Sequence, residues 1–257
     1  MPVSFFLFVG KFGPQYDMIS SKGADVMAQG IQILCNKTKV CTGVQHRFGT
    51  DALLLAGFCR PRRAENAVDL CSGCGIVALA WHDLGHRGPC LAAEIDPEGT
   101  ALLKESRALD EETAHIRPLT ADLRALRDDP GTWHVVACNP PYFAAGPQSP
   151  DAVRARARHE DTCTLQDAAD CAARLLRDGG RFSFCYPPDR LAEAFSALQR
   201  AKLQPKRLVF VKKNAGSAPW LFLCEAQKNR APGLRVLPDL LTGNGGGQGY
   251  QYLAVKD

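Results

Sequence analysis

The tetrad Asn139-Pro140-Pro141-Tyr142 contains the residues best suited to chemistry, and it follows the apolar run Trp133–Cys138. Two successive prolines end a strand because neither has a backbone N–H and both fix φ at about −65°. The Asn139 amide oxygen and the Pro140 carbonyl can then accept hydrogen bonds from one flat amino group, and the Tyr142 ring can stack on it. We therefore predict that these four residues form a catalytic site for a planar substrate carrying –NH2. The simpler alternative is a proline-rich loop after a strand.

A second candidate site is the turn Asp69-Leu70-Cys71-Ser72-Gly73-Cys74-Gly75. Its Gly-x-Gly pattern lacks the third glycine that a dinucleotide site uses. The form Asp-x-x-x-Gly-x-Gly instead resembles the first motif of S-adenosylmethionine-dependent enzymes, whose ligand has no phosphate. That resemblance implies S-adenosylmethionine as the cofactor and Asp69, Cys71, Gly73 and Gly75 as residues that bind it. Asp69 would pair with the cationic methionine amino end, directly or through water.

Two further acids follow later strands and complete the predicted cofactor site. Glu94 ends an apolar run, where its carboxylate can accept both ribose hydroxyls. Asp96 is the rival for that role, but Asp96-Pro97 is typical of a helix N-cap. Asp122 is placed to accept the adenine amino group, and Asn139 is expected to contact the cofactor as well as the acceptor. Each acid taken alone could equally be a surface charge or a cap.

From Asn66 onward, short apolar runs alternate with helix-like stretches, and these elements must position the site residues. The alternation predicts an α/β, Rossmann-like fold with helices on both faces of the sheet. The last two strands are too close in sequence for a helical crossover. We therefore expect a seven-stranded, mostly parallel sheet closed by an antiparallel hairpin, which is the architecture of class I methyltransferases. The expected strands are 67–70, 91–95, 115–119, 133–138, 181–186, 207–212 and 220–225, and the expected helices are 76–84, 97–110, 164–177 (ended by Gly179-Gly180) and 190–201.

Composition and cysteine usage bound the class of protein. The chain has 257 residues, 46% of them hydrophobic, and a formal net charge of +4. Ten Lys/Arg and three acids lie between Arg200 and Asp257, which suggests a polyanionic partner, with a solvated basic face as the alternative. Eleven cysteines do not form a complete set of pairs, and no second Cys/His pair completes a zinc site. We expect a reduced, cytoplasmic, monomeric protein with no metal and no membrane segment.

Three segments are expected along the chain. Residues 1–30 would be an N-terminal extension, of which the first 25 or so are poorly ordered or precede the true start at Met27. Residues 31–240 would form the methyltransferase domain, and residues 241–257 a glycine-rich C-terminal tail.

Two segments that flank these motifs indicate which substrate the protein uses. The first segment, Arg47-Phe48-Gly49-Thr50-Asp51, comes before an Ala/Leu run, and its Thr50 and Asp51 can cap a helix. The second segment is cationic, and substrate phosphates could follow it; it reads Arg154-Ala155-Arg156-Ala157-Arg158-His159-Glu160. Together with the tetrad and the Gly turn, these segments resemble the bacterial tRNA1(Val) (adenine(37)-N(6))-methyltransferase family from about Ile31 to Val236. The resemblance implies methyl transfer to N(6) of a tRNA adenine beside the anticodon. It places Thr50 and Asp51 against the methionine moiety and Glu160 near the substrate mouth; the substrate-binding residues would be Tyr142, Phe143, Arg154, Arg156, Arg158 and His159.

Other functions share parts of this pattern. Protein glutamine methyltransferases of release factors also use the tetrad, because a glutamine amide is a planar –NH2 group, and this class is the main alternative. A DNA adenine methyltransferase would need a target-recognition domain, for which the chain has little room. A cofactor-binding RNA chaperone without catalysis would not need an intact tetrad.

Overall fold

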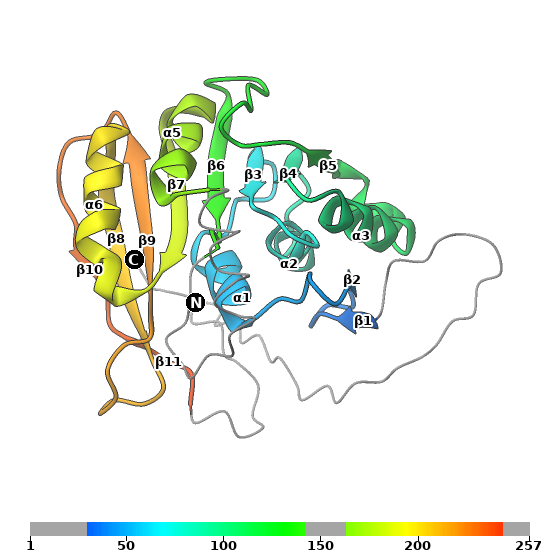
Figure 1. Ribbon diagram of the computed structural model, residues 1–257, viewed down its shortest axis with the longest axis horizontal. Helices are drawn as coiled ribbons and strands as arrows, with labels where there is room; N and C mark the ends of the chain where they lie inside the picture. Colours follow the sequence, from blue (N-terminus) through cyan, green and yellow to red (C-terminus); the bar gives the residue numbers. More distant parts are fainter. Residues whose placement is uncertain (1–29, 142–162, 244–257) are drawn as a thin grey trace, which may run out of the picture.

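The computed structural model describes residues 30–141 and 163–243, and these form a central sheet covered on both faces (Figure 1). The Tyr142, Phe143, Arg154, Arg156, Arg158, His159 and Glu160 predictions, the residues before 30 and most of the tail lie outside the described residues. Five mutually parallel strands occupy the order β7-β6-β3-β4-β5, and β9 lies antiparallel between β7 and β8. Their bounds are β3 Ala67–Leu70, β4 Cys90–Glu94, β5 Ile116–Thr120, β6 Trp133–Cys138, β7 Leu176–Tyr186, β8 Leu203–Lys212 and β9 Leu221–Lys228. The predicted Rossmann-like arrangement, a mostly parallel sheet closed by an antiparallel hairpin with helices on both faces, is confirmed.

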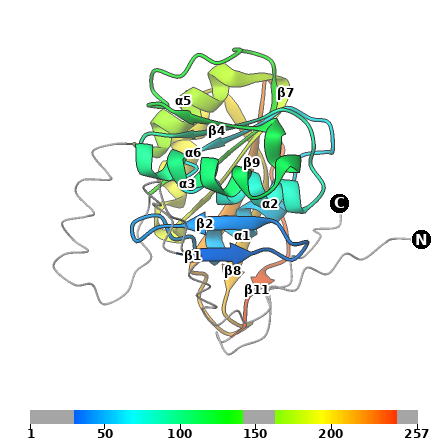
Figure 2. The same ribbon diagram turned by 90° about the vertical axis from the view of Figure 1, so that its right-hand side faces the viewer.

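Four short strands were not predicted. β10 (Arg235–Val236) and β11 (Leu240–Leu241) pair in parallel with the outer edge of β8, so the sheet has nine strands rather than seven. β1 (Gly30–Ile33) and β2 (Lys39–Thr42) form a separate antiparallel hairpin beside α3, which spans Pro97–Ala108 (Figure 2). A backbone N–H of this hairpin, that of Cys41, donates to the Ser106 Oγ of α3 at 2.8 Å. Strands of two to four residues carry too few side chains for a clear alternating pattern.

Two hydrophobic cores lie on the two faces of the sheet. One contains α1 (Thr50–Phe58), α2 (Ile76–Asp83) and the inner side of α3 (Pro97–Ala108), and the other contains α5 (Leu165–Leu175) and α6 (Leu191–Arg200). Successive β6 residues belong to opposite cores, Val135 to the first and Val136 to the second, because side chains alternate along a strand. Short 3-10 helices, η1 Glu111–His115 and η2 Pro188–Arg190, lead into β5 and α6.

Two predicted helix ends are wrong. Helix α5 ends at Leu175, before Gly179-Gly180, because Leu176 leaves helical geometry (φ −66°, ψ 138°) and pairs with Trp133 of β6. The left-handed Gly179 (φ 72°) therefore lies within β7 and does not cap the helix. At the start of α1 the N-cap residue is Gly49 rather than Thr50 or Asp51, and no side chain caps that end. The Asp51 carboxylate instead accepts a hydrogen bond from the Asn139 side chain.

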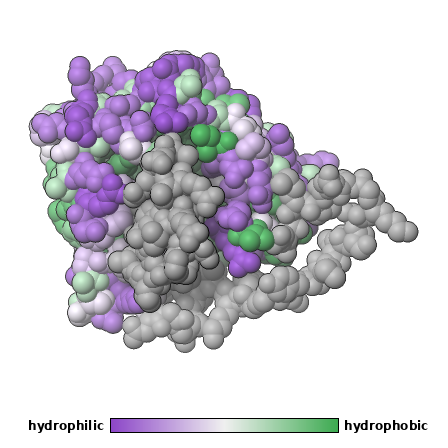
Figure 3. Space-filling view, in the orientation of Figure 1, coloured by the Kyte–Doolittle hydropathy of each residue, from purple (hydrophilic) through white to green (hydrophobic). Residues whose placement is uncertain are grey.

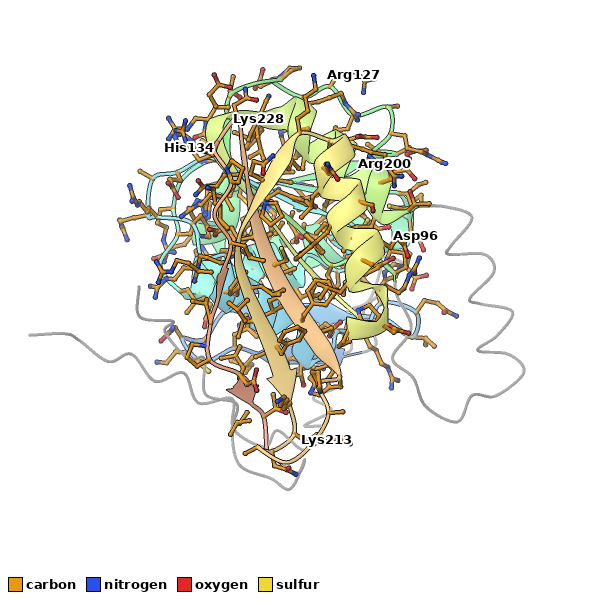
Figure 4. All side chains as sticks on the ribbon, turned by 90° about the vertical axis from the view of Figure 1, so that its left-hand side faces the viewer. Asp96, Arg127, His134, Arg200, Lys213 and Lys228 are labelled. Atoms are coloured by element: carbon orange, nitrogen blue, oxygen red, sulfur yellow. The ribbon has the colours of Figure 1, made fainter. Side chains whose placement is uncertain are left out.

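The described surface is mostly hydrophilic, with small and separate hydrophobic areas on the face shown in Figure 3. Three basic residues of the C-terminal third, Lys213, Lys228 and Arg200, lie on the side of the molecule that faces the viewer in Figure 4. Figure 4 shows Lys228 and Lys213 at opposite ends of the hairpin strands β9 and β8, and Arg200 on α6 beside them. Among the helices of residues 30–141 and 163–243, none has both the length and the apolar character of a membrane span. All eleven cysteines lie in these ranges and are free thiols.

Candidate active site

Those predicted site residues of the described ranges that follow the parallel strands come together at one edge of the sheet. Leu70 of β3 pairs with Ala93 of β4 and with Cys138 of β6, so the chain leaves all three strands at the same level. The Gly turn, Glu94 and Asn139 are consequently neighbours, because parallel strands bring their carboxyl ends to one edge. Asp122 follows β5, which pairs with β4 as far as Thr120.

The Gly turn has an irregular backbone that its sequence allows. Gly73 and Gly75 have φ values of 54° and 82°, a region that glycine adopts without steric cost. Gly75 is the N-cap of α2, and a Cβ at this position would lie 2.5 Å from Leu103 Cδ1. Cys71 has the same left-handed conformation (φ 54°) although it carries a side chain, at a cost of about 1–2 kcal/mol. The turn therefore holds its backbone close to the sheet edge.

The two cysteines of the turn lie on opposite sides of the sheet. Cys74 is buried in the core with α2, whereas Cys71 packs against the core with α5 and lies 4.0 Å from Cys163 (Sγ to Sγ). Burial raises the pKa of the Cys74 thiol to about 12. Cys71 and Cys74 are thus not arranged as a shared metal or redox pair.

Glu94 fixes the Gly turn through its carboxylate. Its Oε2 accepts the Gly73 N–H at 2.8 Å and its Oε1 accepts the Asp96 N–H at 3.0 Å, and the residue is only 9% exposed. Gly99 packs beneath, where a Cβ would lie 2.7 Å from the Gly73 carbonyl oxygen. Each carboxylate oxygen retains a second lone pair for a ligand hydroxyl. Asp96 caps α3 by accepting the Glu98 N–H, as predicted.

Asp69 lies fully buried beneath the turn. Its Oδ2 accepts the Ala78 N–H of α2 at 3.2 Å, and its Oδ1 has no hydrogen-bond partner in the described part of the chain. Burial raises the pKa of this carboxyl to about 8; the Ala78 N–H opposes the shift and the Glu94 charge adds to it. With that pKa the group is largely uncharged at neutral pH, and a cationic group beside this oxygen would favour its charged form.

Asp122 is engaged by a residue that the sequence pattern did not indicate. Both of its carboxylate oxygens contact the Arg124 guanidinium, at 3.0 and 2.6 Å, and Oδ1 also accepts the Arg124 N–H. The Arg124 hydrogen bonds lower the pKa of Asp122. The pair is largely exposed, so a ligand amino group would have to compete with Arg124 for this carboxylate.

Asn139 is held at both ends of its side-chain amide. Its Nδ2 donates to Asp51 Oδ2 of α1 at 3.1 Å, and its Oδ1 accepts the thiol of Cys185 at 2.9 Å. Pro140 is buried and Pro141 partly buried. The sequence predicted Asn139 as a site residue and, through the resemblance, Asp51. It predicted neither the contact between these two residues nor the contact of Cys185 with Asn139.

His46, on the loop before α1, was also not predicted. Its Nε2 lies 3.0 Å from Asp96 Oδ2, and its Nδ1 lies 3.8 Å from the Cβ position of Gly73. Among residues 30–141 and 163–243, His46, Asp96 and Glu98 form the one set of potential ligands whose atoms lie within 4.8 Å of one another. Asp96 also caps α3, so this contact links the loop before α1 to the start of α3.

Comparison with known proteins adds independent information. No family model matches the chain. A tRNA1(Val) (adenine(37)-N6)-methyltransferase from Bacteroides thetaiotaomicron is 29% identical over 175 residues, covering 67% of this chain and 73% of the relative. A protein of the same name from Tolumonas auensis is 28% identical over 182 residues, covering 69% and 74%. The predicted family resemblance is confirmed.

Solved structures agree on the fold. A crystal structure described as a predicted O-methyltransferase from Agrobacterium tumefaciens superposes with a TM-score of 0.63, at 20% identity, over 78% of this chain and 91% of that one. A precorrin-6y C5,15-methyltransferase from Geobacter metallireducens gives 0.51 at 15% identity, over 74% and 94%. At such identities the likeness concerns the fold alone, which is that of class I methyltransferases.

Proposed function

We propose that this protein is an S-adenosylmethionine-dependent methyltransferase that methylates N(6) of an adenine in tRNA, at position 37 beside the anticodon. The observation that carries the proposal is the position of Asn139. Its side-chain amide lies at the sheet edge where Glu94 binds the Gly turn. The amide nitrogen donates to Asp51 and the amide oxygen accepts the Cys185 thiol, so the two ends of the amide are distinguished. The relatives that match the chain support the tRNA adenine as the acceptor.

The residues present fit the proposed cofactor. The Gly73 backbone allows close approach, Glu94 keeps lone pairs for two ribose hydroxyls, and the unpaired Asp69 Oδ1 suits an ammonium group. Asp51 would border the methionine end and Asp122 the adenine end. When bound, S-adenosylmethionine supplies an activated methyl group, so the protein needs no covalent nucleophile of its own.

The chemical task of the chain is to align the acceptor nitrogen and free its lone pair. An aromatic –NH2 is a weak nucleophile because this lone pair is delocalised into the ring. Hydrogen bonds from its two N–H groups to Asn139 Oδ1 and the Pro140 carbonyl favour a pyramidal nitrogen. They strengthen as positive charge grows on that nitrogen, so they stabilise the transition state more than the bound substrate. Tyr142 is proposed to stack on the base.

The acceptor must reach this edge as a single nucleotide. A base in an anticodon loop is already unpaired, which keeps the cost of turning it into a pocket small. Phe143, Arg154, Arg156, Arg158 and His159, in the segment after the tetrad, remain proposed substrate contacts. Binding to phosphates should weaken steeply with salt. A tRNA-modifying role places the protein in the cytoplasm; the expected monomer and the absence of a metal remain predictions.

The test is methylation of bulk tRNA from a strain lacking this gene, followed by mass spectrometry of the nucleosides. We expect N(6)-methyladenosine in one tRNA with the wild-type protein. Asn139→Ala should lower turnover by about 100-fold or more while changing cofactor affinity little, as expected for a group that acts in the transition state. Asn66→Ala, before β3 at the opposite end of the sheet, is the control. Methylation of a release-factor glutamine in place of tRNA would overturn the proposal in favour of the protein glutamine methyltransferases.

A further inference from the structure

The two ends of the Asn139 side-chain amide differ chemically, and only one of them can serve the proposed reaction. The oxygen accepts hydrogen bonds from an amino group, whereas the –NH2 end only donates. A rotation of about 180° around the last side-chain bond exchanges the two ends with little change in shape. A catalytic asparagine therefore needs neighbours that distinguish them.

Asp51 and Cys185 provide that distinction. A carboxylate oxygen of Asp51 can only accept, and it lies 3.1 Å from Nδ2; the thiol of Cys185 can donate, and it lies 2.9 Å from Oδ1. In the rotated orientation the amide oxygen would face the carboxylate and the –NH2 would lie against the thiol. At the Asp51 end two acceptors would meet, which is unfavourable. At the other end the S–H would lose its acceptor, and the –NH2 would have only the sulfur, a weak acceptor, as its partner.

The sheet fixes the position of Cys185. Strands β6 and β7 are parallel neighbours (Figure 1). Cys138 of β6 pairs with Phe184 of β7, so Asn139 and Cys185 follow at the same level. On its other side β7 pairs with β9, where Cys185 lies opposite Leu223. Cys185 is fully buried, and with strands on both sides its backbone has little freedom to move.

A thiol suits this position because it is a weak donor. The S–H group occupies one lone pair of Oδ1 and leaves the other for the acceptor amino group. Asp51 acts from the opposite end, where its acceptor polarises the amide and makes Oδ1 a better hydrogen-bond acceptor. The thiol therefore orients Asn139 without replacing the substrate as its principal partner.

We propose that Cys185 is a positioning residue for Asn139, which it holds with Oδ1 available to the acceptor –NH2. This inference rests on the proposed function for its kinetic consequence, but not for its structural one. Cys185→Ala removes the donor, and kcat should fall about three- to tenfold, the loss of one neutral hydrogen bond, with cofactor Kd within about twofold of wild type. Cys185→Ser keeps an O–H donor and should restore kcat to within about twofold.

The matched control is Cys224→Ala. Cys224 is also fully buried, on the adjacent strand β9, opposite Phe184 and in the other core. It loses the same sulfur atom from the same sheet without touching the tetrad. A loss of kcat in Cys224→Ala as large as that in Cys185→Ala would indicate general loosening of the sheet and would overturn the inference.

A second measurement does not depend on methyl transfer. In protein with 15N-labelled asparagine, the Asn139 side-chain –NH2 signals are identified by their loss in Asn139→Ala. Their exchange with solvent should rise about tenfold or more in Cys185→Ala and stay near wild type in Cys185→Ser and Cys224→Ala. Unchanged exchange in Cys185→Ala overturns the positioning role even if the enzyme is active. A wild-type protein that methylates no tRNA but shows the expected exchange overturns the proposed function alone.

Discussion

The support that Glu94 gives to the Gly turn can be tested by replacing its carboxylate with an amide. Glu94→Gln keeps the size of the side chain but has a single oxygen, whereas the carboxylate accepts two backbone N–H groups, those of Gly73 and Asp96. One N–H must therefore face the new –NH2. A hydrogen bond to a charged acceptor contributes about 1.5–3 kcal/mol, so we expect a loss of about 2 kcal/mol in the free energy of unfolding.

That loss converts into a measurable change in melting temperature. For a protein of this size 1 kcal/mol corresponds to about 2–4 °C, so Glu94→Gln should lower Tm by about 4–8 °C. Circular dichroism of the protein without cofactor measures it. Glu111→Gln is the control, because Glu111 is an exposed residue on η1, far along the chain from the turn. Equal Tm values for the two variants would refute the claim that Glu94 holds the turn.

The same variant tests the role of Glu94 as a ribose acceptor. Isothermal titration with S-adenosylmethionine should show Kd raised by about tenfold or more, since one ribose hydroxyl loses a charged acceptor and the turn loses its support. A lower Tm with unchanged Kd would leave Glu94 as a purely structural residue. In that case Asp96, which also lies at the end of β4, would be the better candidate for the ribose.

Two further predictions concern the same turn. The pKa of Asp69 is raised from 3.8 to about 8, so the stability that its protonated carboxyl contributes is complete below about pH 4 and is lost as the pH rises through 8. The Tm of Asp69→Asn relative to that of the wild type should therefore increase between pH 5 and pH 8. A Tm difference that does not change with pH would contradict the raised pKa. Gly99→Ala should destabilise the fold by about 1–3 kcal/mol and weaken cofactor binding, because its Cβ would lie 2.7 Å from the Gly73 oxygen, whereas Gly216→Ala, with its nearest neighbour at 3.7 Å, should have little effect in the same titrations.

The sheet could be predicted from the sequence because its strands are buried on both faces. Ala67–Leu70 and Trp133–Cys138 are mostly apolar, with Asp69 and His134 as the exceptions, and the predicted and observed limits of these two strands agree. The start of β7 was missed since Leu176–Gly180 is defined by pairing with β6 and carries two glycines. Local preference favoured a helix end there, and tertiary pairing prevailed.

The motifs of the candidate site and their approximate neighbourhood were predictable from the sequence, but the contacts of their side chains were not. Parallel strands guarantee that residues following β3, β4 and β6 meet, so Gly73, Glu94 and Asn139 could be placed together before any coordinates. The partners of these residues could not. The Cys185 thiol reaches Asn139 only because β7 is the neighbour of β6 in this register, and apolar flanks made Cys185 indistinguishable from a packing residue. Arg124 engages Asp122 through a side-chain conformation that spacing does not encode.

The acids of this site have structural roles as well as proposed binding roles, which changes how their variants must be interpreted. Asp69 accepts the Ala78 N–H, and Glu94 accepts those of Gly73 and Asp96, so each supports the backbone of the turn without any ligand. A loss of activity at either position could therefore follow from a displaced turn rather than from a lost contact. Asn139 differs, because the described contacts of its side chain are to two other side chains and none supports the backbone of the turn. Its variants are thus the ones in which lost turnover at unchanged Tm reports on the chemistry itself.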